Sequence, residues 1–223
     1  TRHPSATVDK ILNEELTFEM YKDNAVCANG AMYRKDVRGF LPELMELIYD
    51  ERKIYKKKML AAKQAYEKTP TKKLEKEIAR CNNIQMARKI QLNSAYGAIG
   101  NQYFRYYKLA NAEAITLSGQ VSIRWIENRM NGYLNKLLQT EDVDYVVASD
   151  TDSIYLNLGP LVDKFLSSRS GDKTKVVELL DKVCQDKLEP FIERSYSELA
   201  NYVQAYEQKM IMKRENIAER GIW

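Results

Sequence analysis

The chain has 223 residues, of which 44% are hydrophobic and 30% charged, and its formal net charge is +4 at pH 7. This composition is typical of a globular protein with one large or two modest domains, and no apolar run approaches the ~20 residues of a membrane-spanning helix. Cys27, Cys81 and Cys184 stand far apart and the only histidine, His3, lies in the terminal tail, which argues against a disulfide framework, a zinc site and a histidine-based catalytic triad.

The first forty residues predict mixed structure. Apolar residues at helical spacing favour a helix from Val8 to Tyr21. Asn29-Gly30 then predicts a hairpin turn between Val26-Cys27 and Met32-Tyr33. None of these residues indicates chemistry.

A long helical pattern opens at Pro42, which suits a first helical turn, and runs to about Lys68. Thr69-Pro70-Thr71 breaks it, and a second helix continues to about Ala95, with Gly97 expected as its C-cap residue. Two long helices joined by a tight turn predict an antiparallel helical hairpin. It is too basic and too thin to form a core, so we expect an arm that projects from a body.

The positive charge of the chain is concentrated on this arm. Residues 51–90 hold 13 Lys or Arg against 4 Glu, a net +9, which leaves −5 for the rest of the chain. Such a block fits phosphate binding. A solvated helical surface explains it equally well.

Two stripes of polar residues follow the faces of the predicted helices. Arg52 and Lys56 are four apart on the first helix, and Lys89, Asn93 and Tyr96 share a face of the second. Counted from the turn near residue 70, the two stripes fall at about the same height. Three cations at one level can hold a polyphosphate. The alternative is solvated lysines with a capping asparagine.

The stretch Val146 to Asn157 predicts a β-hairpin with a polar, acidic centre. Asp150 and Asp152 lie either side of Thr151, between β-prone apolar residues. Residues two apart on an extended chain point to the same side, so the two aspartates are expected to share a hard cation such as Mg²⁺. Asp, Ser and Thr are also ordinary turn residues, and a surface turn is the open alternative.

Several of these motifs occur in an order that is typical of one enzyme family. The residues concerned are Lys89-Ile-Gln-Leu-Asn93-Ser94-Ala-Tyr96-Gly97, Asn101-Gln-Tyr-Phe104-Arg-Tyr106-Tyr107, Asn111-Ala-Glu-Ala-Ile-Thr116, Asp150-Thr151-Asp152-Ser153 and Lys213-Arg214-Glu215-Asn216-Ile217-Ala218. They resemble motifs of family B DNA polymerases, in particular the replicative enzymes of tailed bacteriophages. Arg52 and Lys56 match the basic pair of that family's fingers. The resemblance extends from about Val26 to Trp223.

The resemblance implies an α+β fold: an antiparallel palm sheet backed by helices, with an inserted helical-hairpin fingers arm. Residues 1–41 would be the N-terminal part of the palm, 42–96 the fingers, and 97–223 the palm with its catalytic hairpin. A helix from Asn111 to Leu138 would back the sheet. Its apolar residues are Ile115, Val121, Ile123, Trp125, Ile126, Met130, Leu134 and Leu137. Lys175 to Tyr202 would be a further helix or pair, divided near Pro190.

The resemblance also implies roles for the motif residues in two-metal nucleotidyl transfer from dNTPs to a primer 3′-hydroxyl. Asp152 would be the main ligand of two Mg²⁺ ions, with Asp150 beside it and Glu215 as a weaker third carboxylate. Arg52, Lys56 and Lys89 would neutralise the triphosphate, which makes Asp150, Asp152 and Lys89 the catalytic set. Asn93 would contact the nucleotide and Tyr96 the nascent base pair. In the family, closure of the fingers gates the chemistry.

The chain departs from the family pattern in ways that lower the expected activity. The family's other essential aspartate lies in an Asp-x-x-Ser-Leu-Tyr-Pro-Ser motif, and nothing like it precedes Pro42. Ala148-Ser149 stand where Tyr-Gly is common, and Lys213 stands where phage relatives have an acid. We expect the family's exonuclease domain and thumb to lie outside this chain. The chain is therefore expected to be a segment of a polymerase that is inactive by itself.

The expected partners are primer–template DNA, dNTPs, the remaining polymerase portions and a sliding clamp, with no membrane. No apolar region follows Thr1-Arg2-His3-Pro4, so a secretory signal is not predicted, and the cytoplasm of an infected bacterial host is the expected location. The alternative function is a non-catalytic nucleic-acid-binding protein that keeps the basic arm and uses the acidic hairpin only structurally.

Overall fold

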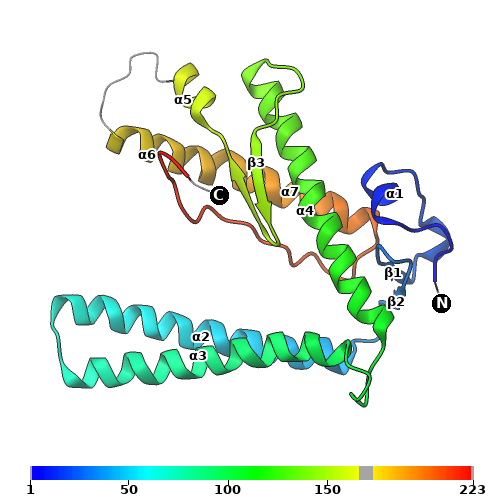
Figure 1. The fold of residues 1–223 in the computed structure, drawn as a ribbon, viewed down its shortest axis with the longest axis horizontal. Coiled ribbons are helices and arrows are strands. Elements are labelled where there is room, and N and C mark those ends of the chain that lie inside the picture. The colour runs from blue at the N-terminus through cyan, green and yellow to red at the C-terminus, as the bar shows by residue number, and fades with distance from the viewer. Residues whose placement is uncertain (1, 166–172, 222–223) are drawn as a thin grey trace. The chain divides into compact units, whose positions relative to one another are not determined.

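The computed structural model describes residues 2–165 and 173–221, and they form an α+β fold, as predicted. Long helices accompany two small antiparallel sheets, β1–β2 and β3–β4 (Figure 1). The chain divides into two compact units: Thr1–Lys35 with Ala114–Trp223, and Asp36–Glu113. Over the described ranges, no helix has the length and apolarity needed to cross a membrane.

The N-terminal helix is shorter than predicted. Helix α1 covers only Val8–Leu12, and a single 3-10 turn follows at Glu19–Tyr21. Leu16, predicted to be helical, is instead held by Tyr202, whose hydroxyl accepts from the Leu16 N–H at 3.3 Å and donates to its carbonyl at 3.1 Å. Because these partners are 186 residues apart, local periodicity gave no sign of this contact.

The predicted N-terminal hairpin is confirmed, with β1 at Asn24–Val26 paired to β2 at Met32–Arg34. Gly30 lies in the turn of this hairpin with a backbone φ of +78°, a conformation that residues other than glycine rarely adopt. A Cβ on Gly30 would lie 2.5 Å from the carbonyl oxygen of His3. The glycine therefore permits both the turn and the close approach of the N-terminal segment.

The unit Asp36–Glu113 contains the predicted helical hairpin. Its helices are α2, Phe40–Lys68, and α3, Lys72–Ile99, separated by the predicted break. Thr71 starts α3 by accepting a hydrogen bond from the Leu74 N–H on its side chain. The end predicted at Gly97 is wrong, because the helix continues to Ile99 with Gly100 as its C-cap.

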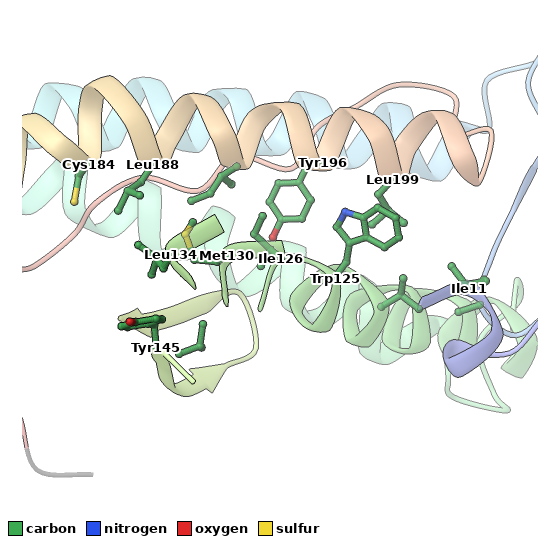
Figure 2. Packing of buried hydrophobic residues seen from close by; sticks show 14 of the residues in the cluster. Ile11, Trp125, Ile126, Met130, Leu134, Tyr145, Cys184, Leu188, Tyr196 and Leu199 are labelled. Atoms are coloured by element: carbon green, nitrogen blue, oxygen red, sulfur yellow. The ribbon is translucent and has the colours of Figure 1, made fainter. Parts of the chain in front are cut away.

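Helix α4 covers Leu109–Leu138, and its part from Ala114 onward belongs to the other unit, which is organised around it and the helical segment Lys173–Tyr202. Figure 2 shows Trp125, Ile126, Met130 and Leu134 of α4 facing side chains of that segment. These four are at most 3% exposed, and Val121 is buried with them, in agreement with the core role expected of this helix. Ile115 is 52% exposed and does not contribute to the core.

The segment Lys173–Tyr202 has three parts: α6, Lys173–Val183; a π-helical turn, Cys184–Leu188; and α7, Glu189–Tyr202. The predicted division near Pro190 therefore takes the form of a π turn that ends just before it. Pro190 has no N–H to donate to the preceding turn, which favours a break of the α-helical ladder at this point. Helix α5, Gly159–Phe165, follows the second hairpin and was not predicted.

Candidate active site

The acidic hairpin is formed by β3, Val146–Asp150, and β4, Ser153–Leu156. Asp150 pairs with Ser153, so that Thr151 and Asp152 make the two-residue turn. The carboxylates of Asp150 and Asp152 are exposed at the tip, whereas Val146 at the base is 4% exposed. The predicted hairpin with its acids at the tip is confirmed.

The turn differs from the extended chain assumed for the two aspartates. Thr151 has φ +50°, a left-handed conformation that is unusual for a β-branched residue. The Asp152 N–H donates to the Asp150 carbonyl at 2.5 Å, and the Thr151 hydroxyl donates to Asp150 Oδ1 at 3.0 Å. The two aspartates therefore do not lie on one extended strand, and the prediction of an extended backbone between them is wrong. A tight turn, fixed by these bonds, places both residues at the tip of the hairpin.

The base of the hairpin is fastened to α4 by two asparagines. Asn131 Oδ1 accepts from the N–H groups of Tyr145 and Val146 at 2.9 and 3.1 Å. Asn135 Oδ1 accepts from the Val143 N–H at 3.1 Å. These positioning residues were not predicted from the sequence. The available signal was a pair of asparagines four residues apart, on one face of the predicted helix.

Tyr196 of α7 is a buried core residue whose hydroxyl senses the negative charge of Asp152. Its ring packs against α4 in Figure 2, and the residue is 3% exposed. Burial, and secondarily the negative charge of Asp152, raise the pKa of Tyr196 to about 12. The hydroxyl therefore stays protonated at neutral pH and presents a neutral group in the field of Asp152. No sequence pattern pointed to this residue.

The raised pKa of Tyr196 predicts a pH dependence of stability. The folded state keeps its proton up to about pH 12, whereas the unfolded chain loses it near pH 10. The free energy of unfolding should therefore fall between pH 10 and 12, by at most about 2.7 kcal/mol from this group. Denaturant unfolding of the unmodified chain and of Tyr196→Phe in metal-free buffer measures it. Equal pH slopes for the two proteins would contradict the assignment.

Glu215 lies in the segment that follows α7, which is neither helix nor strand. Its neighbour Arg214 forms an ion pair with Asp181, and the Arg214 N–H donates to Glu189 Oε1 at 3.1 Å. These two contacts of Arg214 fix the backbone beside Glu215, and the side chain of Glu215 itself is exposed. Within residues 2–165 and 173–221, no three Asp, Glu, His or Cys side chains are arranged to hold a metal. The structure therefore does not gather Asp150, Asp152 and Glu215 into one cluster.

On the arm, an ion pair joins the two helices at the height of the predicted cations. Arg88 of α3 donates from Nε and Nη2 to the two carboxylate oxygens of Glu51 of α2, at 2.7 and 3.1 Å. Arg52 and Lys89 are the next residues along each helix, so they lie about level. Arg52 Nε is buried, and the described residues offer it no hydrogen-bond partner.

The other predicted arm residues are exposed to solvent. Lys56 lies one turn from Arg52 on α2, and Asn93 and Tyr96 follow Lys89 on α3. Tyr96 is 46% exposed. The structure thus places Arg52 and Lys89 at about the same height of the arm, beside the Glu51–Arg88 pair, and the two aspartates at the tip of the hairpin. The roles of these residues, and the division at residues 41/42 and 96/97, stay predictions.

Comparison with known proteins identifies the family. A model described as DNA polymerase family B matches residues 5–211. The DNA-directed DNA polymerases of Escherichia phage RB69 and Enterobacteria phage T4 are each 34% identical over 85% of this chain. The DNA polymerase delta catalytic subunit of Drosophila melanogaster is 28% identical over 59%. The chain spans 26% of the length of each phage relative. The chain belongs to DNA polymerase family B.

Proposed function

We propose that this chain is the palm-and-fingers portion of a phage DNA-directed DNA polymerase, which adds dNTPs to a primer 3′-hydroxyl. The unit containing α4 would be the palm, and the unit containing α2 and α3 the fingers. The proposal rests on one observation above all: two exposed aspartates stand at a rigid hairpin tip whose base is anchored to the core. Family membership supports the same reaction.

The hairpin tip fits a hard divalent cation in its chemistry. Asp150 and Asp152 offer carboxylate oxygens, which Mg²⁺ prefers, and no soft ligand lies in the turn. Bound there, two Mg²⁺ ions would stabilise the charge that develops on the attacking and leaving oxygens. The hairpin's task is to hold Asp152, and Asp150 beside it, in a fixed orientation. We propose Glu215 as a weaker outer carboxylate.

The arm supplies the groups that bind the nucleotide. Arg52 offers a planar fork of donors with a buried, unpaired Nε, and Lys56 and Lys89 offer mobile point charges to the same polyphosphate. Their charge offsets that of the triphosphate in the transition state. Asn93 and Tyr96 would contact the nucleotide and the nascent base pair. We propose that arm closure brings these residues to the aspartates.

A second candidate is a non-catalytic nucleic-acid-binding protein. It is favoured by the lack, among the described residues, of a cluster of three carboxylates, together with the net +9 of residues 51–90. In this case Asp150 would serve only to hold the turn through its bonds to Thr151 and Asp152. Phosphate contacts would still give salt-sensitive binding of duplex DNA.

Primer extension tests both proposals. The purified chain, mixed with primer–template, dNTPs and Mg²⁺, is expected to give no extension, because the second aspartate motif of the family is not in its sequence. Fusion to an upstream segment that carries this motif, taken from a phage relative, is expected to give metal-dependent extension. Extension by the chain alone would contradict the proposed incompleteness. A folded fusion that binds duplex DNA without extending it would favour the non-catalytic candidate.

A further inference from the structure

The buried contacts between the two helices of the arm only weakly determine how one helix is rotated against the other. The buried side chains between them are Met59 and Ala62 of α2 and Cys81 and Gln85 of α3. Methionine is flexible and alanine and cysteine are small, so these contacts tolerate a rotation of one helix against the other. The turn at Thr69-Pro70-Thr71 fixes the helices at the tip, but Glu51 lies about 18 residues, or roughly 27 Å, from it.

The Glu51–Arg88 ion pair is a direct polar contact between the two helices at that distance from the turn. The guanidinium binds both carboxylate oxygens, and its third nitrogen, Nη1, donates to Gln91 Oε1 at 2.8 Å. A two-pronged pair restricts direction as well as distance. The pair is partly buried, with side chains 30% and 40% exposed. The pairs Lys53–Asp50 and Arg80–Glu77 each lie within one helix, and the contact of Arg80 with the Tyr55 ring of α2, at 5.9 Å from its centroid, lies nearer the turn.

The position of this pair determines where the phosphate-binding cations stand. Successive residues of an α-helix are separated by about 100° around its axis. Arg52 follows Glu51 and Lys89 follows Arg88, so the same rotation leads from the pair to each cation. Because the helices are antiparallel and face each other, equal rotations lead to the same side of the hairpin. Lys56, four residues after Arg52, extends this side toward the tip.

We propose that Glu51 and Arg88 are positioning residues that hold Arg52 and Lys89 level on one side of the arm, so that both bind the phosphates of one nucleotide. This inference rests on the proposed function. Neither residue contacts the phosphates, and each acts through its neighbour. Glu51 and Arg88 differ in this from Arg52, whose buried Nε is left unpaired.

The direction in which a substitution at Glu51 changes nucleotide affinity distinguishes a positioning role from a purely electrostatic one. Glu51→Ala removes a negative charge beside the cations, which by charge alone would tighten the binding of an anion. Positioning predicts the opposite. The dissociation constant for dATP with Mg²⁺, measured by calorimetry on the full chain, should rise about fivefold. The swap of Glu51→Arg with Arg88→Glu rebuilds the pair and should recover most of this loss.

Asp50→Ala is the matched control, because it makes the same charge change one residue away. Asp50 forms an ion pair within its own helix, with Lys53 at 2.7 Å. Its removal should leave the affinity unchanged or higher. Circular dichroism should show equal helix content for all variants. If Glu51→Ala and Asp50→Ala change the affinity in the same direction by similar factors, the positioning role is overturned.

A structural measurement separates failure of this inference from failure of the proposed function. Spin labels at positions 52 and 89, with the native cysteines replaced, report the distance between the two stripes. Glu51→Ala should broaden this distance distribution and Asp50→Ala should not. If the unmodified chain binds no triphosphate, the proposed function fails, and the labels still decide the role of the pair. An unchanged distribution in Glu51→Ala would contradict the alignment.

Discussion

Replacing Asp152 with asparagine is expected to lower nucleotide incorporation by about a thousandfold in the fusion that carries the upstream aspartate motif. Asparagine keeps the size of the side chain and its hydrogen-bonding oxygen but removes the charge that holds a divalent cation. Asp152 is exposed at the turn and its N–H donates to Asp150, so the backbone bond survives the change. Single-nucleotide incorporation under quenched-flow conditions measures the loss.

The control for this prediction is a substitution that changes the hairpin without removing a carboxylate. Ser153→Ala deletes a hydroxyl that donates to the Asp150 carbonyl at 3.2 Å and should cost less than about tenfold. Duplex binding at fixed salt should be retained in both variants. Incorporation by Asp152→Asn within tenfold of the unmodified fusion would show that the acidic tip has no catalytic role.

Replacing Trp125 with alanine should lower the free energy of unfolding by about 3–5 kcal/mol, the largest stability effect we expect from a single change. Trp125 is 3% exposed, and its indole N–H donates to the Ser195 carbonyl at 3.0 Å. Arg129 lies over the ring at 4.4 Å from its centroid. Alanine leaves a cavity between α4 and α7 and an unpaired carbonyl. Urea unfolding followed by circular dichroism measures the change.

Trp125→Phe divides this loss into its parts. Phenylalanine fills most of the volume but cannot donate to Ser195, so its cost should be about 1–3 kcal/mol. Ile115→Ala, on the exposed face of the same helix, should cost less than about 0.5 kcal/mol. A cost for Ile115→Ala that equals that of Trp125→Ala would contradict the description of the core.

Elements set by local chemistry could be predicted from the sequence. Thr69-Pro70-Thr71 ended one long helix and started another, because proline cannot continue a helix and Thr71 caps the next one. Asn29-Gly30 predicted the first hairpin because Gly30 takes a positive φ. The acidic hairpin followed from β-prone residues around a polar centre. Its turn geometry did not, since Thr151 takes a conformation that threonine rarely adopts.

Elements set by distant partners could not be predicted in this way. The pattern from Val8 to Tyr21 fits a helix, yet Tyr202 holds Leu16 out of it. The roles of Asn131 and Tyr196 depend on which strands and helices meet, and no local pattern carries that information. The height of the cations on the arm was predictable because both helices are counted from one turn. The ion pair that fixes their rotation was not.

The π turn at Cys184–Leu188 helps a long helical segment keep one row of residues against the straight helix α4. Buried residues recur every four positions along this segment: Leu180, Cys184, Leu188, Ile192 and Tyr196. In an ideal α-helix a four-residue step overshoots one turn by about 40°, so such a row would spiral off the surface of α4. The wider π turn unwinds the helix midway and removes part of that drift. Because a π turn holds one residue more than an α turn, deleting one residue inside it should leave a regular α-helix with Ile192 and Tyr196 still facing the core.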